Sequence, residues 1–269
     1  MTTPFYKTAP DRTSAGLAAI AWRAGTVVME VYRSDFVARM KADDTPVTLA
    51  DQRAEALILP ALARLLPGVP VVSEESFDAA GTALPANATF LLVDPLDGTR
   101  EFLKRNGEFT VNIALIEAGR PTAGCVYAPA VGEMYFAGTH AYALAQDPDA
   151  AFDAAIAQPI EARAAPASGA VALVSRSHRD PDTERFLAGV EGVRHESIGS
   201  SLKFCRIAAG RADLYPRFGA TMEWDVAAGH AVLQAAGGSV TTPEGAPFSY
   251  GKFARGLRNG PFIARGRRP

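Results

Sequence analysis

The sequence predicts an α+β fold, in which two long helices are followed by a run of antiparallel strands. Spaced apolar residues within alanine-rich segments predict helices over residues 14–33 and 48–66. Four apolar segments separated by turn-forming residues predict an antiparallel meander over residues 109–117, 124–127, 133–137 and 141–144. With 269 residues, 48% of them hydrophobic, the chain can bury the core of one large domain or two modest ones.

Composition and charge exclude several classes of function. Lysine and arginine number 27 against 29 acidic residues, and a net charge of -2 gives no electrostatic basis for binding a nucleic-acid polymer. No apolar run approaches about 20 residues and the N-terminus does not resemble a signal peptide, so we expect a cytoplasmic protein without a transmembrane segment. Peripheral association with the cytoplasmic side of the inner membrane, and the choice between monomer and homodimer, stay open. Cys125 and Cys205 are far apart in apolar strings, so we expect reduced core residues.

The two predicted helices differ in how they begin. Thr13 or Ser14 is available as the N-cap of the first helix, and the proline-broken segment 41–47 predicts a loop. Thr48, with an acidic residue three positions later, predicts the start of the second helix. That acidic residue, Asp51, would offset the positive end of the helix.

Two predicted strands end in acidic residues. The first, over residues 69–72, leads to Glu74 and Glu75, and the second, over residues 90–93, leads to Asp94. An isolated pair of glutamates is usually solvated at the surface. Because both acidic segments follow buried strands, neighbouring strands would place Glu74 beside Asp94.

The segment after the second strand concentrates polar groups. Pro95 predicts the end of the strand, Asp97 and Gly98 predict a turn, and residues 99–104 predict a helix whose first N–H groups face the two aspartates. Two carboxylates in one turn repel each other unless a cation lies between them, and oxygen ligands favour a hard ion such as Mg²⁺. Alternatively, Asp97 only caps the helix.

Two segments rich in alanine, glycine, proline and asparagine interrupt this pattern. Residues 77–88 predict a flexible excursion between strands, and residues 146–169 predict a boundary between two halves of the chain. The halves, 1–150 and 151–269, would together form one unit. A core strand over residues 171–174 opens the second half.

The second half contains candidate contacts for an anionic substrate. His178 follows the strand and is by itself typical of a surface residue. Gly199 to Ser201 precede a predicted helix over residues 202–209, where a serine N-cap and a helix N-terminus suit a phosphate. Lys203 in the first turn opposes the helix dipole, which a bound anion would explain. Arg217 ends a strand and can bind phosphate through two N–H groups.

Asp225 precedes the last long helix, predicted over residues 226–236. As an isolated residue it would serve as an N-cap. Gly237 and Gly238 end the helix.

Four stretches of the chain resemble a known superfamily. Residues 94–99, with the sequence DPLDGT, resemble the signature of the inositol monophosphatase superfamily of Mg²⁺-dependent, lithium-sensitive phosphatases. Residues 100–115 resemble more closely the bacterial 3′(2′),5′-bisphosphate nucleotidases of the CysQ type, as do residues 199–205 and 214–219. The resemblance implies a layered α/β/α/β/α sandwich, with a metal-binding first half and a second half that contacts substrate.

The resemblance also implies roles for individual residues. It implies two or three Mg²⁺ ions, held by side chains or carbonyls of Glu74, Asp94, Leu96, Asp97 and Asp225. Asp51 would accept a hydrogen bond from Thr99, which orients the attacking water, and Glu75 would hold water or a further metal ion. Substrate contacts would come from Glu74, Leu96, Asp97, Gly98, Thr99, His178, Ser200, Lys203, Arg217 and Asp225.

The resemblance implies hydrolysis of the 3′-phosphate of adenosine 3′,5′-bisphosphate, and of its 5′-phosphosulfate analogue, in sulfur assimilation. Inositol monophosphatase or fructose-1,6-bisphosphatase activity is the enzymatic alternative. A sensor that binds Mg²⁺ and nucleotide is the non-enzymatic alternative. The intact pair of Asp51 and Thr99 favours an enzyme, because a binding protein does not need an activated water.

Overall fold

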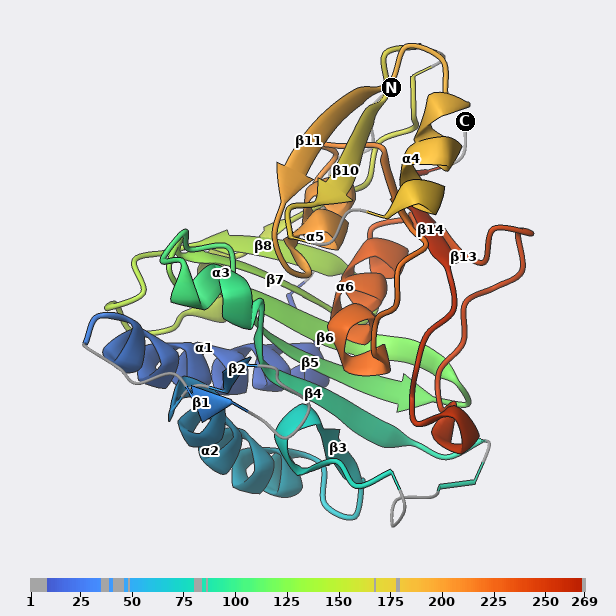
Figure 1. Ribbon diagram of the computed structural model, residues 1–269. Coiled ribbons are helices and arrows are strands. Elements are labelled where there is room, and N and C mark those ends of the chain that lie inside the picture. The colour runs from blue at the N-terminus through green and yellow to red at the C-terminus, as the bar shows by residue number, and fades with distance from the viewer. Residues whose placement is uncertain are drawn as a thin grey trace.

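The computed structural model describes residues 9–34, 39–40, 46–47, 49–79, 84–85, 87–166, 168–177 and 180–267. Two sheets and the helices around them form stacked layers (Figure 1). The large sheet contains, in spatial order, β3 (Val71–Ser73), β4 (Phe90–Asp97), β5 (Thr110–Glu117), β6 (Arg120–Ala128), β7 (Glu133–Ala137), β8 (Ala141–Ala145) and β9 (Gln158–Pro159). Strand β3 is parallel to β4, and the remaining pairs are antiparallel, which confirms the predicted meander. Because β9 pairs with β8, this sheet extends past residue 150.

The smaller sheet lies entirely in the second half of the chain. Its spatial order is β11 (Arg194–Ile198), β10 (Val171–Ser175), β12 (Leu214–Arg217), β14 (Phe262–Arg265) and β13 (Ser239–Thr241). Strands β11, β10 and β12 are parallel, whereas β14 is antiparallel to both of its neighbours. Strands β11, β13 and β14 were not predicted from the sequence.

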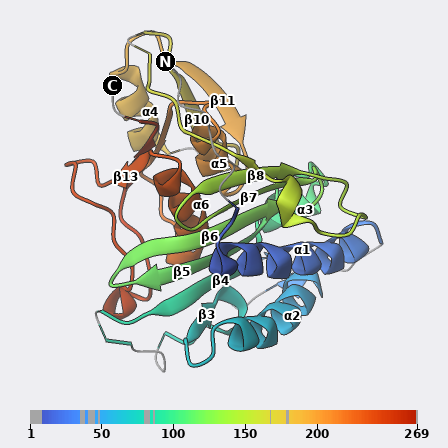
Figure 2. The ribbon, with the colours of Figure 1, turned by 180° about the vertical axis from the view of Figure 1, so that it is seen from behind.

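Helices occupy both faces of each sheet. Helices α1 (Arg12–Tyr32) and α2 (Leu49–Leu65) lie side by side on the outer face of the large sheet (Figure 2). Between the two sheets lie α5 (Leu202–Ala208) and α6 (Glu223–Ala235), and α4 (Pro181–Ala188) packs against the far face of the small sheet. The predicted α/β/α/β/α sandwich is therefore confirmed.

The alternation of side chains along β4 joins two cores. Phe90 and Leu92 pack into the core between the sheets, whereas Leu91 and Val93 pack against α1 and α2. Every residue from Phe90 to Leu96 is buried, which fits a central strand covered on both faces. The acidic end of β4 is therefore supported by a strand segment that is packed on both faces.

Several details of the first helices differ from expectation. Asp11, not Thr13 or Ser14, caps α1 by accepting a hydrogen bond from the Ser14 N–H at 2.9 Å. Pro46 and Val47 form strand β2 (Pro46–Val47), which pairs with β1 (Arg39–Met40), so the predicted loop is shorter. The rest of that loop and Thr48 lie outside the described residues.

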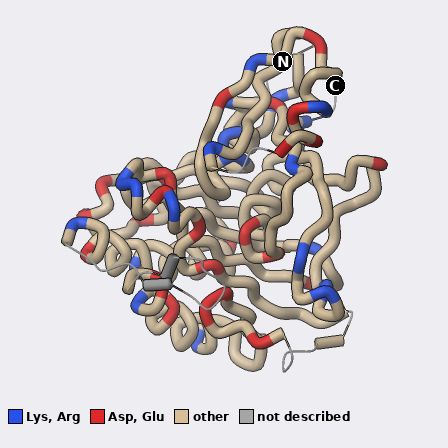
Figure 3. The backbone as a smooth tube through the Cα atoms, in the orientation of Figure 1, with Lys and Arg blue, Asp and Glu red and all other residues tan. Residues whose placement is uncertain are grey.

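The remaining elements are short: α3 (Thr99–Leu103) and the 3-10 turns η1 (Glu74–Ser76), η2 (Ala154–Ile156) and η3 (Phe253–Arg255). Cys125 and Cys205 are buried and reduced, as predicted. No helix among the described residues is long and apolar enough to span a membrane. Acidic and basic residues are interspersed over the described chain (Figure 3).

Candidate active site

The end of β4 is a β-bulge. Asp94 pairs with Asn112 and Asp97 pairs with Thr110, so one extra residue lies on β4 between these pairs. Pro95 lies in this irregular part, where a residue without an N–H does not break the ladder. The prediction that Pro95 ends the strand was therefore wrong. The Leu96 N–H turns back and donates to Asp94 Oδ1 at 3.1 Å, which fixes that carboxylate.

Gly98 makes the turn from β4 into α3. Its φ of 90° lies in the left-handed region, and a Cβ at this position would lie 3.2 Å from the Glu108 carbonyl oxygen. Helix α3 begins at Thr99, as predicted, but has only five residues. Gly98 holds its N-cap position without a side-chain hydrogen bond, so Asp97 does not cap α3.

Three carboxylates from different elements converge beside this turn. Glu74, Asp94 and Asp225 each have an oxygen atom within 4.8 Å of the other two. Strands β3 and β4 are parallel, and Ser73 lies opposite Val93. The residues that follow, Glu74 and Asp94, therefore lie side by side where the two strands point toward the same side of the sheet. We call Glu74, Asp94 and Asp225 the acidic cluster.

Asp225 reaches the acidic cluster from the first turn of α6. The helix begins at Glu223, earlier than predicted, and Met222 holds its N-cap position. Asp225 is therefore not the N-cap, although its Oδ2 accepts a hydrogen bond from the Met222 N–H at 2.8 Å. This bond orients the carboxylate toward β4.

The electrostatics of the acidic cluster favour a cation. Asp94 is 1% exposed, and burial, followed by the charges of Glu74, Asp97, Asp225 and Asp51, raises its pKa well above the ordinary value. The pKa of Asp225 is raised too, first by burial and then by Asp97 and Glu74. Among the described residues, the gathered ligands are carboxylate oxygens without a nitrogen or sulfur ligand. Such a set suits a hard dication, so these residues fit Mg²⁺.

Asp97 connects β4 to α5. Its Oδ2 accepts hydrogen bonds from Ser200 Oγ at 2.6 Å and from the Ser201 N–H at 2.8 Å, and Ser201 Oγ lies 3.2 Å away. Ser201 holds the N-cap position of α5, but its side chain makes no capping bond within the helix. A serine therefore holds the N-cap position as predicted, but the N–H of Ser201 already donates to a carboxylate of the chain, and a phosphate contact at this helix start stays a prediction.

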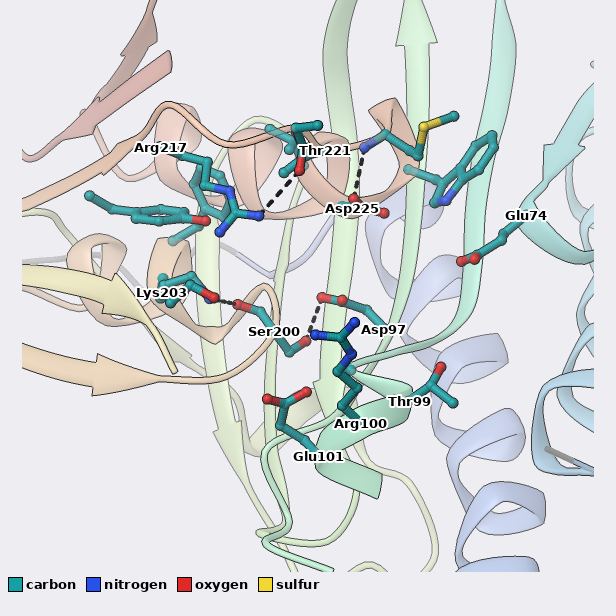
Figure 4. Close-up of a pocket in the computed structure, with 18 residues that line it drawn as sticks. Glu74, Asp97, Thr99, Arg100, Glu101, Ser200, Lys203, Arg217, Thr221 and Asp225 are labelled. Atoms are coloured by element: carbon teal, nitrogen blue, oxygen red, sulfur yellow. Dashed lines mark hydrogen bonds between the residues drawn. The ribbon is translucent and has the colours of Figure 1, made fainter. Parts of the chain in front are cut away.

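A cavity of about 320 Å³ opens next to the acidic cluster. Figure 4 shows Glu74, Asp225 and Thr99 toward one end, and Lys203 and Arg217 at the other. The predicted residues that line this cavity are Glu74, Asp97, Gly98, Thr99, Ser200, Lys203, Arg217 and Asp225. The structure therefore brings together carboxylates and cations from both halves of the chain.

The two cations at the far end are held by backbone carbonyls. Lys203 is 4% exposed, donates from Nζ to the carbonyl oxygens of Ile198 and Ser200, and lies 5.1 Å from the centre of the Tyr215 ring. Burial lowers the pKa of Lys203 to about 8. Arg217, also buried, donates to the carbonyl oxygens of residues 219 and 220 at 3.2 Å.

The other predicted residues have different positions. Asp51 is buried in the first turn of α2, and its charge contributes to the raised pKa of Asp94. Glu75 follows Glu74 in η1, and Leu96 is buried in the bulge. His178 lies outside the described residues.

Two charged residues of the cavity were not predicted from the sequence. Arg100 and Glu101 follow Thr99 in α3, and both line the cavity. Glu101 is 4% exposed, and its Oε1 accepts a hydrogen bond from Ser177 Oγ. Their position directly after the acidic turn was the available signal, because the first turn of α3 faces the same space as the turn itself.

Comparison with known proteins places this site in a family context. Residues 10–261 match the model of the inositol monophosphatase family. The chain is 45% identical over 236 residues to the 3′(2′),5′-bisphosphate nucleotidase CysQ of Escherichia coli strain K12, covering 86% of this chain and 91% of that protein.

Solved structures show the same relationship. CysQ from Bacteroides thetaiotaomicron, a bacterial member of the inositol monophosphatase family, superposes with a TM-score of 0.80 at 37% identity over 96% of this chain and 98% of that chain. The inositol monophosphatase from Anabaena superposes with a TM-score of 0.71 at 25% identity over 95% of this chain and 90% of that chain. The fold, the sequence match and these relatives agree, and the chain belongs to the inositol monophosphatase family.

Proposed function

We propose that this protein is a Mg²⁺-dependent 3′(2′),5′-bisphosphate nucleotidase, which hydrolyses adenosine 3′,5′-bisphosphate to AMP and phosphate. The observation that carries the proposal is a cavity with an acidic cluster at one end and Lys203 and Arg217 at the other. Such a cavity matches a substrate with one phosphate to be cleaved and a second to be held. The nucleotidase relatives support the same substrate class. The 5′-phosphosulfate analogue is a further proposed substrate.

The acidic residues would hold the metal ions. Glu74, Asp94 and the Leu96 carbonyl are assigned to one Mg²⁺, and Asp94, Asp97 and Asp225 to a second. Bound Mg²⁺ supplies positive charge to the phosphate and lowers the pKa of water, two requirements for hydrolysing a very unreactive ester near neutral pH. The burial and raised pKa of Asp94 fit this assignment, because a dication relieves the same repulsion as a proton.

Thr99 and Asp51 are assigned to the attacking water. In hydrolysis the water oxygen bonds to phosphorus while the bond from phosphorus to the ribose 3′-oxygen breaks, and the leaving oxygen takes up a proton. The Thr99 hydroxyl would accept from the water and donate to Asp51, which orients the water in line. Glu75 is assigned to holding a further water, and the N–H groups of Gly98 and Thr99 to the phosphoryl oxygens.

The second half of the chain is assigned to the nucleotide. Lys203 and Arg217 are proposed to attract the second phosphate, with Ser200 and His178 as further contacts. The division into a metal-binding half, residues 1–150, and a substrate-binding half, residues 151–269, stays a proposal, with Asp225 as the metal ligand that the second half contributes. The cytoplasmic location and the monomer or homodimer state remain predictions.

Phosphate release from a substrate panel tests the proposal. The panel contains adenosine 3′,5′-bisphosphate, its 5′-phosphosulfate analogue, inositol 1-phosphate and fructose 1,6-bisphosphate, each with Mg²⁺ and with EDTA. We expect the highest kcat/KM for adenosine 3′,5′-bisphosphate and no activity with EDTA. A preference for inositol 1-phosphate or fructose 1,6-bisphosphate would replace the proposed activity. Tight nucleotide binding without phosphate release would instead indicate a sensor.

A further inference from the structure

Arg100 differs from the other cations of the cavity in being exposed to solvent. It is the second residue of α3, directly after Thr99. Figure 4 shows its guanidinium group extending from α3 into the cavity. Within the described part of the chain, no hydrogen bond or ion pair of Arg100 is found. The donors of this guanidinium group therefore face the cavity without a protein acceptor among those residues.

Lys203 and Arg217 are engaged differently. Both are buried, and both donate to backbone carbonyl oxygens. A phosphate that binds them must share donors already used to hold the backbone. Arg100 offers a planar fork of N–H groups that matches two phosphate oxygens without breaking such bonds.

The acids nearest to Arg100 in the sequence do not form an ion pair with it. Oε1 of Glu101 accepts from Ser177 Oγ, and Oδ2 of Asp97 accepts from Ser200 and Ser201. These bonds direct both carboxylates toward the second half of the chain. The positive charge of Arg100 is therefore left for a ligand in the cavity.

We propose that Arg100 binds the 5′-phosphate of the substrate, the phosphate that is not cleaved, and so selects bisphosphorylated over monophosphorylated nucleotides. This inference rests on the proposed nucleotidase activity. The acidic cluster with bound Mg²⁺ would meet the charge of the 3′-phosphate. Lys203 and Arg217, which are assigned to attract the second phosphate, share their donors with backbone carbonyl oxygens, so the 5′-phosphate needs a further partner in the cavity. In Figure 4, Arg100 lies between the acidic cluster and the Lys203 end of the cavity. A nucleotide held by its 3′-phosphate at the acidic cluster would extend in this direction.

The test compares two substrates that differ only in the 5′-phosphate. kcat/KM is measured for adenosine 3′,5′-bisphosphate and for adenosine 3′-monophosphate with the wild-type protein, Arg100→Ala and Arg100→Lys. The matched control is Lys104→Ala, which removes an exposed positive charge at the C-terminal end of α3, away from the cavity-lining residues. Thermal unfolding checks that each variant is folded.

We expect Arg100→Ala to lower the ratio of the two kcat/KM values by about 10- to 100-fold, the range of a charge-assisted hydrogen bond. Arg100→Lys should recover part of this ratio, because it keeps the charge but not the fork, and Lys104→Ala should leave the ratio within about twofold. An equal loss for both substrates would place Arg100 on the cleaved phosphate and overturn the inference. An unchanged ratio with unchanged rates would also overturn the inference, because it would show that Arg100 is only a solvated surface residue. If the wild-type protein hydrolyses neither nucleotide, the proposed function fails and the inference with it.

Discussion

Asp94→Asn should separate the metal-binding role of the acidic cluster from its contribution to folding. The substitution keeps the size of the side chain, and the amide oxygen can still accept from the Leu96 N–H. It removes one negative charge from a residue that is 1% exposed and faces Glu74 and Asp225. We expect activity at saturating Mg²⁺ to be abolished, because a neutral amide cannot balance two dications, while the metal-free protein becomes more stable.

The size of the stabilisation follows from the spacing of the carboxylates. Two like charges at the limiting separation of 4.8 Å repel by about 3.5 kcal/mol at an effective dielectric constant of 20 and by about 0.9 kcal/mol in bulk water. Proton uptake by Asp94 limits this cost, so we expect a gain of about 1–3 kcal/mol in the free energy of unfolding. For a chain of this size the Tm should rise by about 2–10 °C.

The difference in stability between Asp94→Asn and the wild-type protein should depend on pH. Because the folded pKa of Asp94 is raised, the folded protein holds this proton more tightly than the unfolded chain. The destabilising charge is absent below the unfolded pKa of about 4 and develops as the pH rises through the raised folded pKa. The Tm advantage of Asp94→Asn in EDTA should therefore be largest at neutral pH and vanish near pH 4.

Thermal unfolding in EDTA and in Mg²⁺ measures both effects. Mg²⁺ should raise the Tm of the wild-type protein far more than that of Asp94→Asn, so that the order of stability reverses. Asp213→Asn is the matched control, because Asp213 is equally buried but pairs with Arg163 through two bonds of 2.7 Å, which lower its pKa against the effect of burial. That control should lower the Tm. A lower Tm for Asp94→Asn in EDTA at neutral pH, or equal stabilisation of both proteins by Mg²⁺, would refute the reasoning.

Three further predictions concern turnover. Thr99→Ala should lower kcat by about 10² to 10⁴ with little change in KM, and Asp51→Asn should do the same. The double variant should be scarcely worse than either single variant. If steady-state kinetics show instead that the two losses multiply, the two residues act independently. Li⁺ should inhibit and Mg²⁺ should relieve the inhibition, because a monovalent ion balances less carboxylate charge; LiCl titrations at two Mg²⁺ concentrations, with KCl as control, test this. Lys203, with a pKa of about 8, should lose its charge above that pH, so kcat/KM should fall there in the wild-type protein but not in an active Lys203→Arg variant.

The placement of Glu74 and Asp94 after two buried apolar runs was predictable because its signals are local. Short apolar runs define each strand, and the acidic residues come directly after them, at Glu74 and Asp94. The prediction then needed only the assumption that the two strands are neighbours, and the structure shows them paired in parallel. The acid that follows on α6, Asp225, was reached by resemblance, since nothing in its own segment points to β4.

The missed features depend on partners far away in the sequence. Strand β4 continues past Pro95 because β5 accepts a bulge opposite it, a property of the pair rather than of either strand. Strand β11 has mostly exposed and half-buried residues and no apolar run, so only its parallel neighbour β10 identifies it as a strand. Periodicity cannot report pairing of this kind.

Asp97 shows why a substitution at a predicted ligand can mislead. Its Oδ2 accepts from Ser201, and Ser201 Oγ donates to the Asp225 carbonyl oxygen at 2.6 Å, so Asp97 joins β4, α5 and α6. Asp97→Asn would change both a proposed metal ligand and the anchor of the helix that carries another. Ser201→Ala removes the hydroxyl link to α6 but leaves the Asp97 carboxylate and the Ser201 N–H. If Asp97→Asn loses the Mg²⁺-dependent rise in Tm and Ser201→Ala keeps it, the Asp97 carboxylate acts as a metal ligand. If both variants lose the rise in Tm, the anchoring of Asp225 explains the effect of either substitution.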